Sequence, residues 1–188
     1  MKTKLLLGLV LAAGLVPVAC GADRPVGDPG GTLATTAPDP PAFSVAAQFA
    51  AEGPQPGDEA ATANTTAVVH SAHFANSYRY TVSAAKRLMT APEGSVYLVV
   101  DAAVTNSGTA KRFGGGGDFS VTTADGASHD PLEFGGDEAL GFTLLFLGQT
   151  LGGMLVFELP ADTARATLVH GPSDEPSAVM WRLERSGG

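Results

Sequence analysis

Cysteine is nearly absent from this sequence, because Cys20 is the only one among 188 residues. A disulfide within the chain is therefore excluded, and any folded domain must be stabilised by a buried apolar core. Long apolar runs are missing too. The run 5–16 has about a dozen residues, whereas a membrane-spanning helix needs about 20. That run has the length of the apolar region of an export signal.

Basic residues are also few, 11 against 19 acidic residues, and the formal net charge is -8. Nucleic acids are bound through clusters of Lys and Arg, so this composition argues against a nucleic-acid partner. Removal of residues 1–19 would take away two lysines and no acid. The remaining excess of acid argues against electrostatic adhesion of the chain to anionic lipid, so membrane attachment is expected through acyl chains.

The N-terminus has the layout of an export signal, with two lysines before the apolar run and Pro17-Val18-Ala19 after it. Cys20 follows directly, which resembles a lipobox, where a cysteine after small residues is lipidated and becomes the first residue. Pro17 departs from that pattern, because a leucine is usual there. We expect a lipoprotein signal peptide at 1–19, a lipid anchor such as palmitate on Cys20, and a location at the extracytoplasmic face of the cell membrane or envelope. The alternative is an ordinary signal peptide with an incidental cysteine.

Residues 20–62 are rich in proline, alanine and glycine. A segment of this composition buries too little apolar surface to offset its chain entropy, so we expect a disordered tether. Within it, residues 43–51 are apolar enough to form a helical turn or to dock on the domain. From residue 63 to residue 188 the pattern changes, and we expect one folded domain.

The region after the tether consists of short segments rich in β-branched and aromatic residues, separated by Gly, Pro, Asn and Asp. None of them shows a long 3.6-residue period, so helices are not expected. The pattern predicts an all-β fold, an immunoglobulin-like antiparallel β-sandwich. Strands are expected at 65–74, 78–86, 95–106, 118–123, 141–147, 153–159, 164–170 and 178–184, with a core drawn from Val68, Tyr80, Val82, Tyr97, Val99, Phe119, Val121, Leu155, Phe157, Leu168 and Trp181.

Four motifs occur in order along these strands: Tyr80-Thr81-Val82, residues 94–106, Phe119-Ser120-Val121, and Gly148-Gln149-Thr150 followed by residues 153–160. Together they resemble the telokin-like, immunoglobulin-fold domain of unknown function that occurs in many bacterial lipoproteins. The resemblance covers about residues 65–184. It implies a fold and a place at the cell envelope. It implies no chemistry, because the family offers no established catalytic residues to carry over.

Four histidines are candidate ligands. His70 and His73 have the spacing His-x-x-His. Residues three apart on a regular strand point to opposite faces, so both rings reach one metal only if a bulge intervenes. His129 and His170 are isolated in the sequence. A composite histidine site built from several loops is the alternative to surface or interface histidines.

Four acidic residues, Asp125, Asp130, Asp137 and Glu138, lie in one loop-rich stretch, and carboxylate oxygens of this kind suit calcium. Their spacing does not match the calcium loop of an EF-hand, so a solvated acidic surface is the expected interpretation. We assign no metal and no cofactor. The candidate ligands are His70, His73, His129, Asp125 and Asp130.

Motifs of catalysis are missing. Residues 114–117 are all glycine, but the Gly-Lys-Ser/Thr ending of a phosphate loop is absent, and we expect a flexible loop between strands. No Gly-x-Ser-x-Gly elbow occurs, and lipidation would leave no free cysteine as nucleophile. We therefore expect no enzyme. The sequence favours a non-catalytic module that binds an unknown protein or ligand through its loops, and a metal or small-ligand carrier of the envelope is the alternative.

Overall fold

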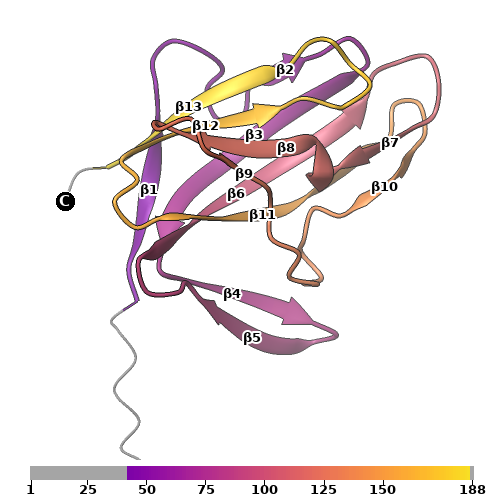
Figure 1. Ribbon diagram of the computed structural model, residues 1–188. Helices are drawn as coiled ribbons and strands as arrows, with labels where there is room; N and C mark the ends of the chain where they lie inside the picture. Colours follow the sequence, from indigo (N-terminus) through magenta and orange to yellow (C-terminus); the bar gives the residue numbers. More distant parts are fainter. Residues whose placement is uncertain (1–41, 187–188) are drawn as a thin grey trace, which may run out of the picture. The chain divides into compact units, whose positions relative to one another are not determined.

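The computed structural model describes residues 42–186, which are built almost wholly of β-strands (Figure 1). The helical structure in this range is a single 3-10 turn, η1 (Gly116–Asp118). No helix within the range is long and apolar enough to cross a membrane. The expected signal peptide at 1–19, Cys20 and the first part of the expected tether lie outside the described residues.

The strands are short, except for three that cross the whole domain. Those three are β3 (Thr65–Ala75), β6 (Ser95–Asn106) and β11 (Thr150–Pro160). The others are β1 (Ser44–Phe49), β2 (Glu59–Ala61), β4 (Ser77–Val82), β5 (Ala85–Thr90), β7 (Arg112–Gly115), β8 (Phe119–Thr123), β9 (Ser128–His129), β10 (Phe142–Leu145), β12 (Arg165–His170) and β13 (Val179–Arg185).

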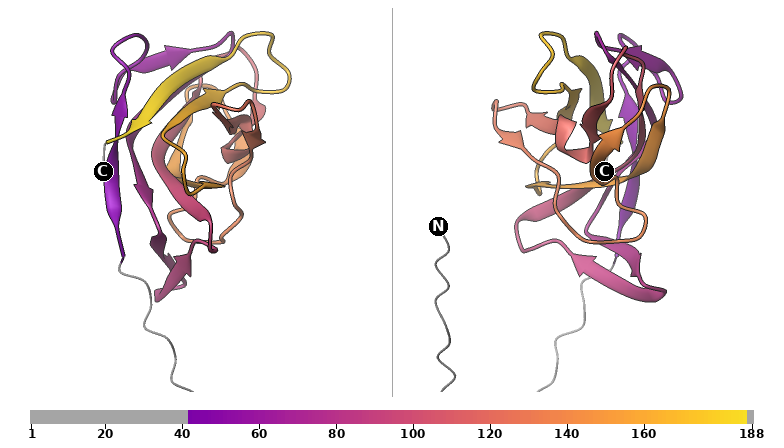
Figure 2. Two further views of the ribbon diagram at one scale, coloured as in Figure 1. Left: turned by 60° about the vertical axis from the view of Figure 1, so that its left-hand side comes forward. Right: turned by 90° about the vertical axis from the view of Figure 1, so that its right-hand side faces the viewer.

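Strand β1 divides the main strands between two layers. Its residues 44–46 pair with β3, and its residues 47–49 pair with β13. The hydrogen-bonded order is β11-β6-β3-β1-β13-β12-β8-β9, with β2 against β3. The order folds back on itself at β1, so that the β3 and β6 layer faces the β12 and β13 layer (Figure 2). All pairs of named strands are antiparallel, which confirms the predicted antiparallel β-sandwich.

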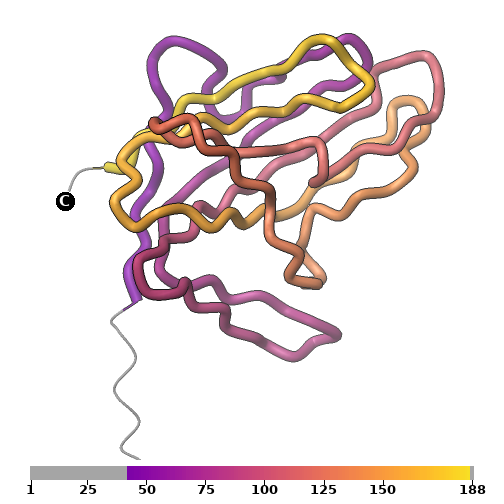
Figure 3. The backbone as a smooth tube through the Cα atoms, viewed as in Figure 1, coloured from indigo at the N-terminus to yellow at the C-terminus, as the bar shows by residue number. Residues whose placement is uncertain are grey.

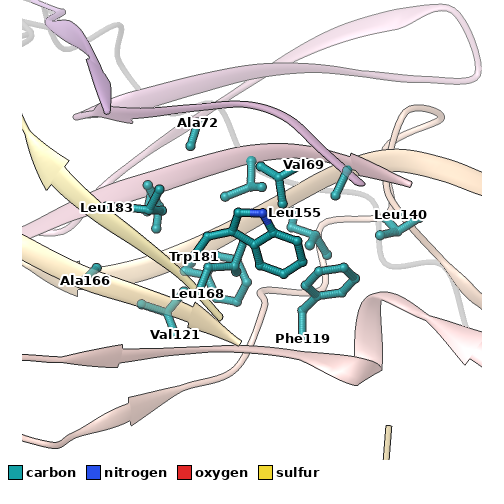
Figure 4. Packing of buried hydrophobic residues seen from close by; sticks show 14 of the residues in the cluster. Val69, Ala72, Phe119, Val121, Leu140, Leu155, Ala166, Leu168, Trp181 and Leu183 are labelled. Atoms are coloured by element: carbon teal, nitrogen blue, oxygen red, sulfur yellow. The ribbon is translucent and has the colours of Figure 1, made fainter. Parts of the chain in front are cut away.

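Trp181 lies in the centre of the core between the two layers (Figure 4). Its side chain is 0% exposed. Around it gather Leu168 and Phe119 from its own layer, and Val69 and Leu155 from the opposite layer. The predicted burial of Trp181 is confirmed. Burial of an aromatic side chain of this size is among the largest single apolar contributions that a small sandwich can make.

The predicted core is wrong at three positions. Val68 is only half-buried, whereas its neighbour Val69 is fully buried, because inward and outward residues alternate along β3. With two adjacent valines, the sequence does not show which of them points into the core. Tyr80 and Val82 are half-buried as well. They lie on the hairpin β4–β5, which belongs to neither layer.

Strand β6 is buried on both faces. One face joins the main core, and the other carries Tyr97 and Val99 into a second apolar cluster with Val156 of β11. The hairpin β4–β5 covers this cluster, because Tyr78 and Met89 pack against it. The loop of residues 130–141 runs down to the same hairpin (Figure 3), where the backbone N–H of Asp137 donates to the carbonyl oxygen of Thr81 at 2.7 Å.

The expected tether at 20–62 is wrong for its described part, because this part contains β1 and β2. Every second residue of β1 is half-buried, and Phe43, Ala47 and Phe49 pack against the core. The strand was missed because its partners, β3 and β13, lie far along the sequence, and pairing of this kind leaves no local signal. The folded domain therefore already includes β1, ahead of residue 63.

Candidate binding groove

Strands β7 and β10 form a two-stranded ribbon that does not pair with the strands of the main layers (Figure 1). Leu144 lies opposite Phe113 in this ribbon, and Phe142 lies opposite Gly115. Opposed residues and every second residue of a strand share a face, so Phe113, Phe142 and Leu144 lie on one face. The two phenylalanine rings stack, with centroids 6.0 Å apart and planes 13° apart. They are 63% and 58% exposed.

A second exposed apolar pair follows in the turn between β10 and β11. Phe146 and Leu147 are 60% and 59% exposed there. The turn is fixed by Gln149, whose side-chain oxygen accepts the N–H of Phe146 at 3.0 Å. Exposed apolar side chains that gather in one region are typical of interaction sites. We call Phe113, Phe142, Phe146 and Leu147 the ribbon patch.

Glycines hold the ribbon close to the chain segment that precedes β10. A Cβ atom on Gly115 would collide with the carbonyl oxygen of Gly141, and one on Gly116 would collide with that of Leu140. Gly115 also has a φ of 136°, which side chains rarely tolerate. The expectation of a flexible glycine loop is therefore wrong. These glycines form the end of β7 and the turn η1, because only glycine permits backbones to approach so closely.

A groove with a volume of about 730 Å³ lies beside the ribbon. The loop of residues 131–142 forms one wall, and η1 and β11 form the others. Most of the lining side chains are apolar, and the polar ones include Asp118 and Ser173. Phe142 belongs both to this lining and to the ribbon patch, so the groove opens next to the exposed aromatic rings. The apolar lining is Pro131, Leu132, Phe134, Ala139, Leu140, Phe142, Met154 and Leu155.

Asp118 is the acid at the glycine end of the groove. Its Oδ2 atom accepts the N–H of Gly115 at 3.1 Å, which closes the turn η1. Burial raises the pKa of Asp118, and the hydrogen bond from Gly115 and the charge of Arg112 only partly offset that effect. The carboxylate therefore stabilises the turn while its charge remains partly desolvated at the groove.

Arg112 forms an ion cluster next to the ribbon. Its guanidinium contacts Asp174, at 2.5 Å, and Glu175. The side chain of Glu175 is 0% exposed, and it also accepts the N–H of Asn64 at 3.0 Å. Burial alone would raise the pKa of Glu175, but hydrogen bonds from Thr62, Arg112 and Asn64 outweigh it and lower that pKa. The cluster ties the start of β7 to the loop between β12 and β13.

His170 is enclosed in the core and faces no groove. Its Nε2 atom lies 3.0 Å from the Oγ1 atom of Thr65, and its ring lies 4.7 Å from that of Phe119 between centroids. Nδ1 is buried without a hydrogen-bond partner. Burial lowers the pKa of His170 to about 4, so the ring is neutral at pH 7. This histidine acts as a packed core residue.

His70 and His73 are separated by a β-bulge, because the register of β3 against β6 shifts between Val69 and Ser71. The bulge turns His70 to the surface, while Val69 and Phe74 point into the core. His73 is half-buried, and burial lowers its pKa. No group of three or more His, Cys, Asp or Glu side chains within residues 42–186 is placed to hold a metal ion.

The other predicted ligands are also dispersed. Asp125 caps the turn between β8 and β9, where Oδ1 accepts the hydroxyl of Thr123 at 2.5 Å and the N–H of Ala127 at 3.2 Å. These hydrogen bonds lower the pKa of Asp125. His129 lies in β9, and Asp130 follows it, exposed.

The two remaining acids of that stretch bind backbone instead of a cation. An Asp137 oxygen accepts the N–H of Ser83 at 3.2 Å, and both Glu138 oxygens accept the N–H of Thr81, at 3.0 and 3.1 Å. They attach the loop of residues 130–141 to β4. The acidic stretch is thus used in part for tertiary structure.

The ribbon patch was missed in the sequence. Phe142, Leu144 and Phe146 alternate with Thr143 and Leu145, but apolar residues on both faces hide which face is buried. Leu145 is the residue that enters the core. The signal that could have found the patch is the all-glycine segment opposite, because glycine offers no side chain to cover a neighbouring aromatic ring.

No protein-family model and no curated protein matches this sequence. Several solved structures are similar, among them the three that follow. One is a candidate lipoprotein (ycdA) from Bacillus subtilis, with 16% identity and a TM-score of 0.53, over 70% of this chain and 39% of that one. Another is a conserved hypothetical protein from Bacillus anthracis, with 10% identity and a TM-score of 0.51, over 74% of this chain and 96% of that one. The third is an uncharacterised β-sandwich protein from Clostridium difficile, with 14% identity and a TM-score of 0.43, over 67% of this chain and 89% of that one.

This chain therefore spans about two fifths of the Bacillus subtilis protein and nearly the whole of the Bacillus anthracis one. Identities this low show a shared fold and nothing finer. This chain shares the fold of the Bacillus subtilis and Bacillus anthracis structures, which are described as a candidate lipoprotein and a conserved hypothetical protein.

Proposed function

We propose that the protein is a lipid-anchored, extracytoplasmic binding module of the telokin-like type, which holds a protein or ligand at the groove and ribbon patch without catalysing a reaction. The exposed stack of Phe113 and Phe142 is the observation that carries this proposal. Burial of aromatic rings dominates the energetics of many interfaces. Two stacked rings that are exposed to water would therefore contribute favourable free energy when a partner covers them.

The groove supports the same proposal. Its volume of about 730 Å³ is within the range of about 300 to 1,000 Å³ that is common for ligand sites. Apolar walls supply most of the contact area, while Asp118 and Ser173 offer polar groups at one end. Because Phe142 belongs to both the groove and the patch, one bound segment would contact both.

The titratable groups favour binding over catalysis. Among the described residues that line the groove, Asp118 and Glu133 are the only ones with titratable side chains. Asp118 already accepts the N–H of Gly115. His170 is enclosed by Thr65 and Phe119 and is neutral at pH 7, so it is not available to exchange a proton with a ligand.

The lipid anchor is supported by the layout of residues 1–19 around Cys20. The likeness to a candidate lipoprotein of Bacillus subtilis agrees with it. An extracytoplasmic location follows from the same signal. The tether that would join this anchor to the domain is proposed to end where β1 begins.

Photo-crosslinking in cells tests the binding site. Benzoylphenylalanine is placed at position 142, and the control is placed at Met180, whose exposure of 56% matches the 58% of Phe142. We expect a defined adduct from position 142 that is lost when Phe113→Ser is added, and none from position 180. Equal labelling from both positions, or none from either, would overturn the binding site.

A carrier of a small apolar ligand is the second candidate, and the groove volume favours it. Mass spectrometry of a solvent extract of the purified protein should then reveal a bound molecule. Met154→Trp, which fills the groove, should expel that molecule, whereas Met180→Trp on the surface should not. Calorimetric titration with copper, zinc and calcium tests whether the protein is instead a metal carrier. The absence of binding heat would exclude a metal carrier.

A further inference from the structure

The hairpin β4–β5 is basic in an acidic protein. It carries Arg79, Lys86 and Arg87, three of the 11 basic residues of the chain. No Asp or Glu occurs between residues 77 and 90, although the chain has 19 acidic residues. The net charge of the whole protein, -8, therefore hides a local charge of opposite sign. A local cluster of this kind determines whether a surface attracts an anion, because the effect of charges more than about 10 Å away is largely screened at ordinary ionic strength.

The register of the hairpin separates its two faces. Arg79 lies opposite Leu88, and Lys86 lies opposite Thr81, so Arg79, Lys86 and Leu88 share one face. All three are exposed, and Leu88 is 48% exposed. Arg87 lies opposite Tyr80, so it belongs to the other face of the hairpin, but its side chain is exposed as well. We call Arg79, Lys86, Arg87 and Leu88 the basic hairpin patch.

The two tyrosines on the other face of the hairpin are turned toward the protein. Tyr78 and Tyr80 both pack edge-on against Phe134, with centroids 5.5 and 5.4 Å away. Two acids, Glu138 and Asp101, lie near Tyr78 on this side. Both oxygens of Glu138 accept the N–H of Thr81.

No acid within residues 42–186 forms an ion pair with Arg79, Lys86 or Arg87. In contrast, Arg112 forms two ion pairs, and Arg165 and Arg182 form one each. The cations of the hairpin therefore keep their charge available to an external partner. Asp137 contacts the tip of the hairpin, but its oxygen is bound to the N–H of Ser83.

The hairpin lies at the end of the domain where the chain arrives from its N-terminal part. Phe43 and Asn76 are bonded to each other there, with the N–H of Phe43 donating to Oδ1 of Asn76 at 3.0 Å and the N–H of Asn76 donating to the carbonyl oxygen of Phe43 at 3.3 Å. Asn76 directly precedes β4. Figures 1 and 2 show β1 starting at the level of the hairpin. A chain held at Cys20 thus enters the described part of the domain beside the basic hairpin patch.

We propose that the basic hairpin patch docks on the anionic lipid headgroups of the bilayer that holds the protein, with Leu88 entering the interface between headgroups and acyl chains. This proposal rests on the lipid anchor of the proposed function. The anchor keeps the domain near the bilayer, and the hairpin sets its orientation, with the groove turned to one side. An anchor and a basic patch together are the combination that gives stable membrane attachment.

Vesicles that contain the purified full-length protein test the proposal. Leu88→Cys carries an environment-sensitive dye, and Met180→Cys at the other end of the domain carries it as the control. The vesicles are neutral phosphatidylcholine or phosphatidylcholine with about one third phosphatidylglycerol, an anionic fraction chosen to give a strong surface potential. We expect a blue shift and quenching by headgroup-labelled lipid only for position 88, and only in the anionic vesicles.

A charge-matched pair of variants separates the hairpin from the overall charge. Arg79→Gln/Lys86→Gln/Arg87→Gln should abolish the quenching at position 88. The control variant Lys111→Gln/Arg165→Gln/Arg182→Gln removes the same amount of positive charge from exposed sites elsewhere. It should leave the quenching at position 88 unchanged. Equal quenching in neutral and anionic vesicles, or equal loss in the two triple variants, would overturn the proposal.

Failure of the anchor gives a different result. An unlipidated Cys20 would take up the dye itself, and the protein would not stay with neutral vesicles. The same triple variants are then compared by sedimentation with anionic vesicles. Loss of binding by about a hundredfold for the hairpin variant alone supports the hairpin, because each surface cation changes lipid binding about fivefold. Equal binding of both variants overturns it.

Discussion

The Oγ1 atom of Thr65 lies 3.0 Å from the Nε2 atom of His170, although 105 residues separate the two in the chain. Both side chains are 0% exposed. Thr65 begins β3 in one layer and His170 ends β12 in the other, so this hydrogen bond joins the two layers inside the core. A buried polar contact of this kind makes the sandwich sensitive to protonation.

We expect the free energy of unfolding to fall as the pH decreases from 6.5 toward 4. The pKa of His170 in the folded protein, about 4, lies below its ordinary value of 6.5, so the unfolded chain binds the extra proton in this range. His170→Gln should remove about 2 kcal/mol of that pH dependence. Urea unfolding at about pH 7.5 and about pH 4.5 measures it. His70→Gln, at an exposed position, is the control, and an equal change in both variants would contradict the assignment.

Burial of Trp181 gives a spectroscopic prediction. Trp181 is the only tryptophan and is 0% exposed, so its emission should be blue-shifted in the folded state and should redden on unfolding. Trp181→Ala should lower the free energy of unfolding by about 3 to 5 kcal/mol. Phe142→Ala, at an exposed ring, should change it by less than about 0.5 kcal/mol. Similar losses in both variants would be inconsistent with the packing.

The close approach at η1 predicts a difference between two nearby glycines. Gly116→Ala would place a methyl group against the carbonyl oxygen of Leu140 and should cost about 1 to 3 kcal/mol of stability. Gly141→Ala meets no atom within 4 Å and should be nearly neutral. Thermal unfolding of both variants checks this. A neutral Gly116→Ala would show that the ribbon can shift away from residue 140.

The ion cluster of Arg112 should matter more than the surface pair of Arg165. Arg112→Ala leaves Glu175, which is 0% exposed, without its cation, and should cost about 3 to 5 kcal/mol. Arg165→Ala breaks a pair with Glu184 in which both side chains are at least half exposed, and should cost less than about 1 kcal/mol. Denaturant unfolding at neutral pH tests the contrast, and equal losses would argue against a buried Glu175.

Cys20→Ala should release the protein from the membrane fraction or leave it unprocessed, because the acyl chains would have no sulfur to which they can attach. Fractionation of cells and the mass of the N-terminal peptide measure both effects. Ser44→Ala keeps Cys20 and serves as the control. A correctly cleaved Cys20→Ala protein that stays with the membrane would refute the anchor.

The main strands could be predicted because their signals are local. Runs rich in β-branched and apolar residues between turn residues predicted 95–106, which matches β6 to the residue, and 65–74, which lies within β3. The hairpin was harder. The expected single strand 78–86 is instead β4, a turn and β5, because Ser83 and Ala84 adopt positive φ angles without the Gly or Asn that usually mark such a turn.

The candidate site could not be predicted in the same way. Phe113 and Phe142 are brought together by the register of β7 against β10. The pairing register of two strands cannot be read directly from the sequence. The histidines and acids that suggested a metal site were chosen by residue type. Their surroundings do not favour a metal site, because the carboxylates of Asp125 and Glu138 already accept backbone N–H groups.

Strand β1 also has a mechanical meaning. It is the first strand in the part of the chain that the structure describes, and its two halves are hydrogen-bonded to different layers. A pulling force applied to the chain ahead of residue 44 therefore enters both layers through one strand. The bonds of residues 44–46 to β3 bear the load first, and those of residues 47–49 to β13 follow. If the chain is held at Cys20, the sandwich meets tension from the cell surface at the strand that joins its two halves.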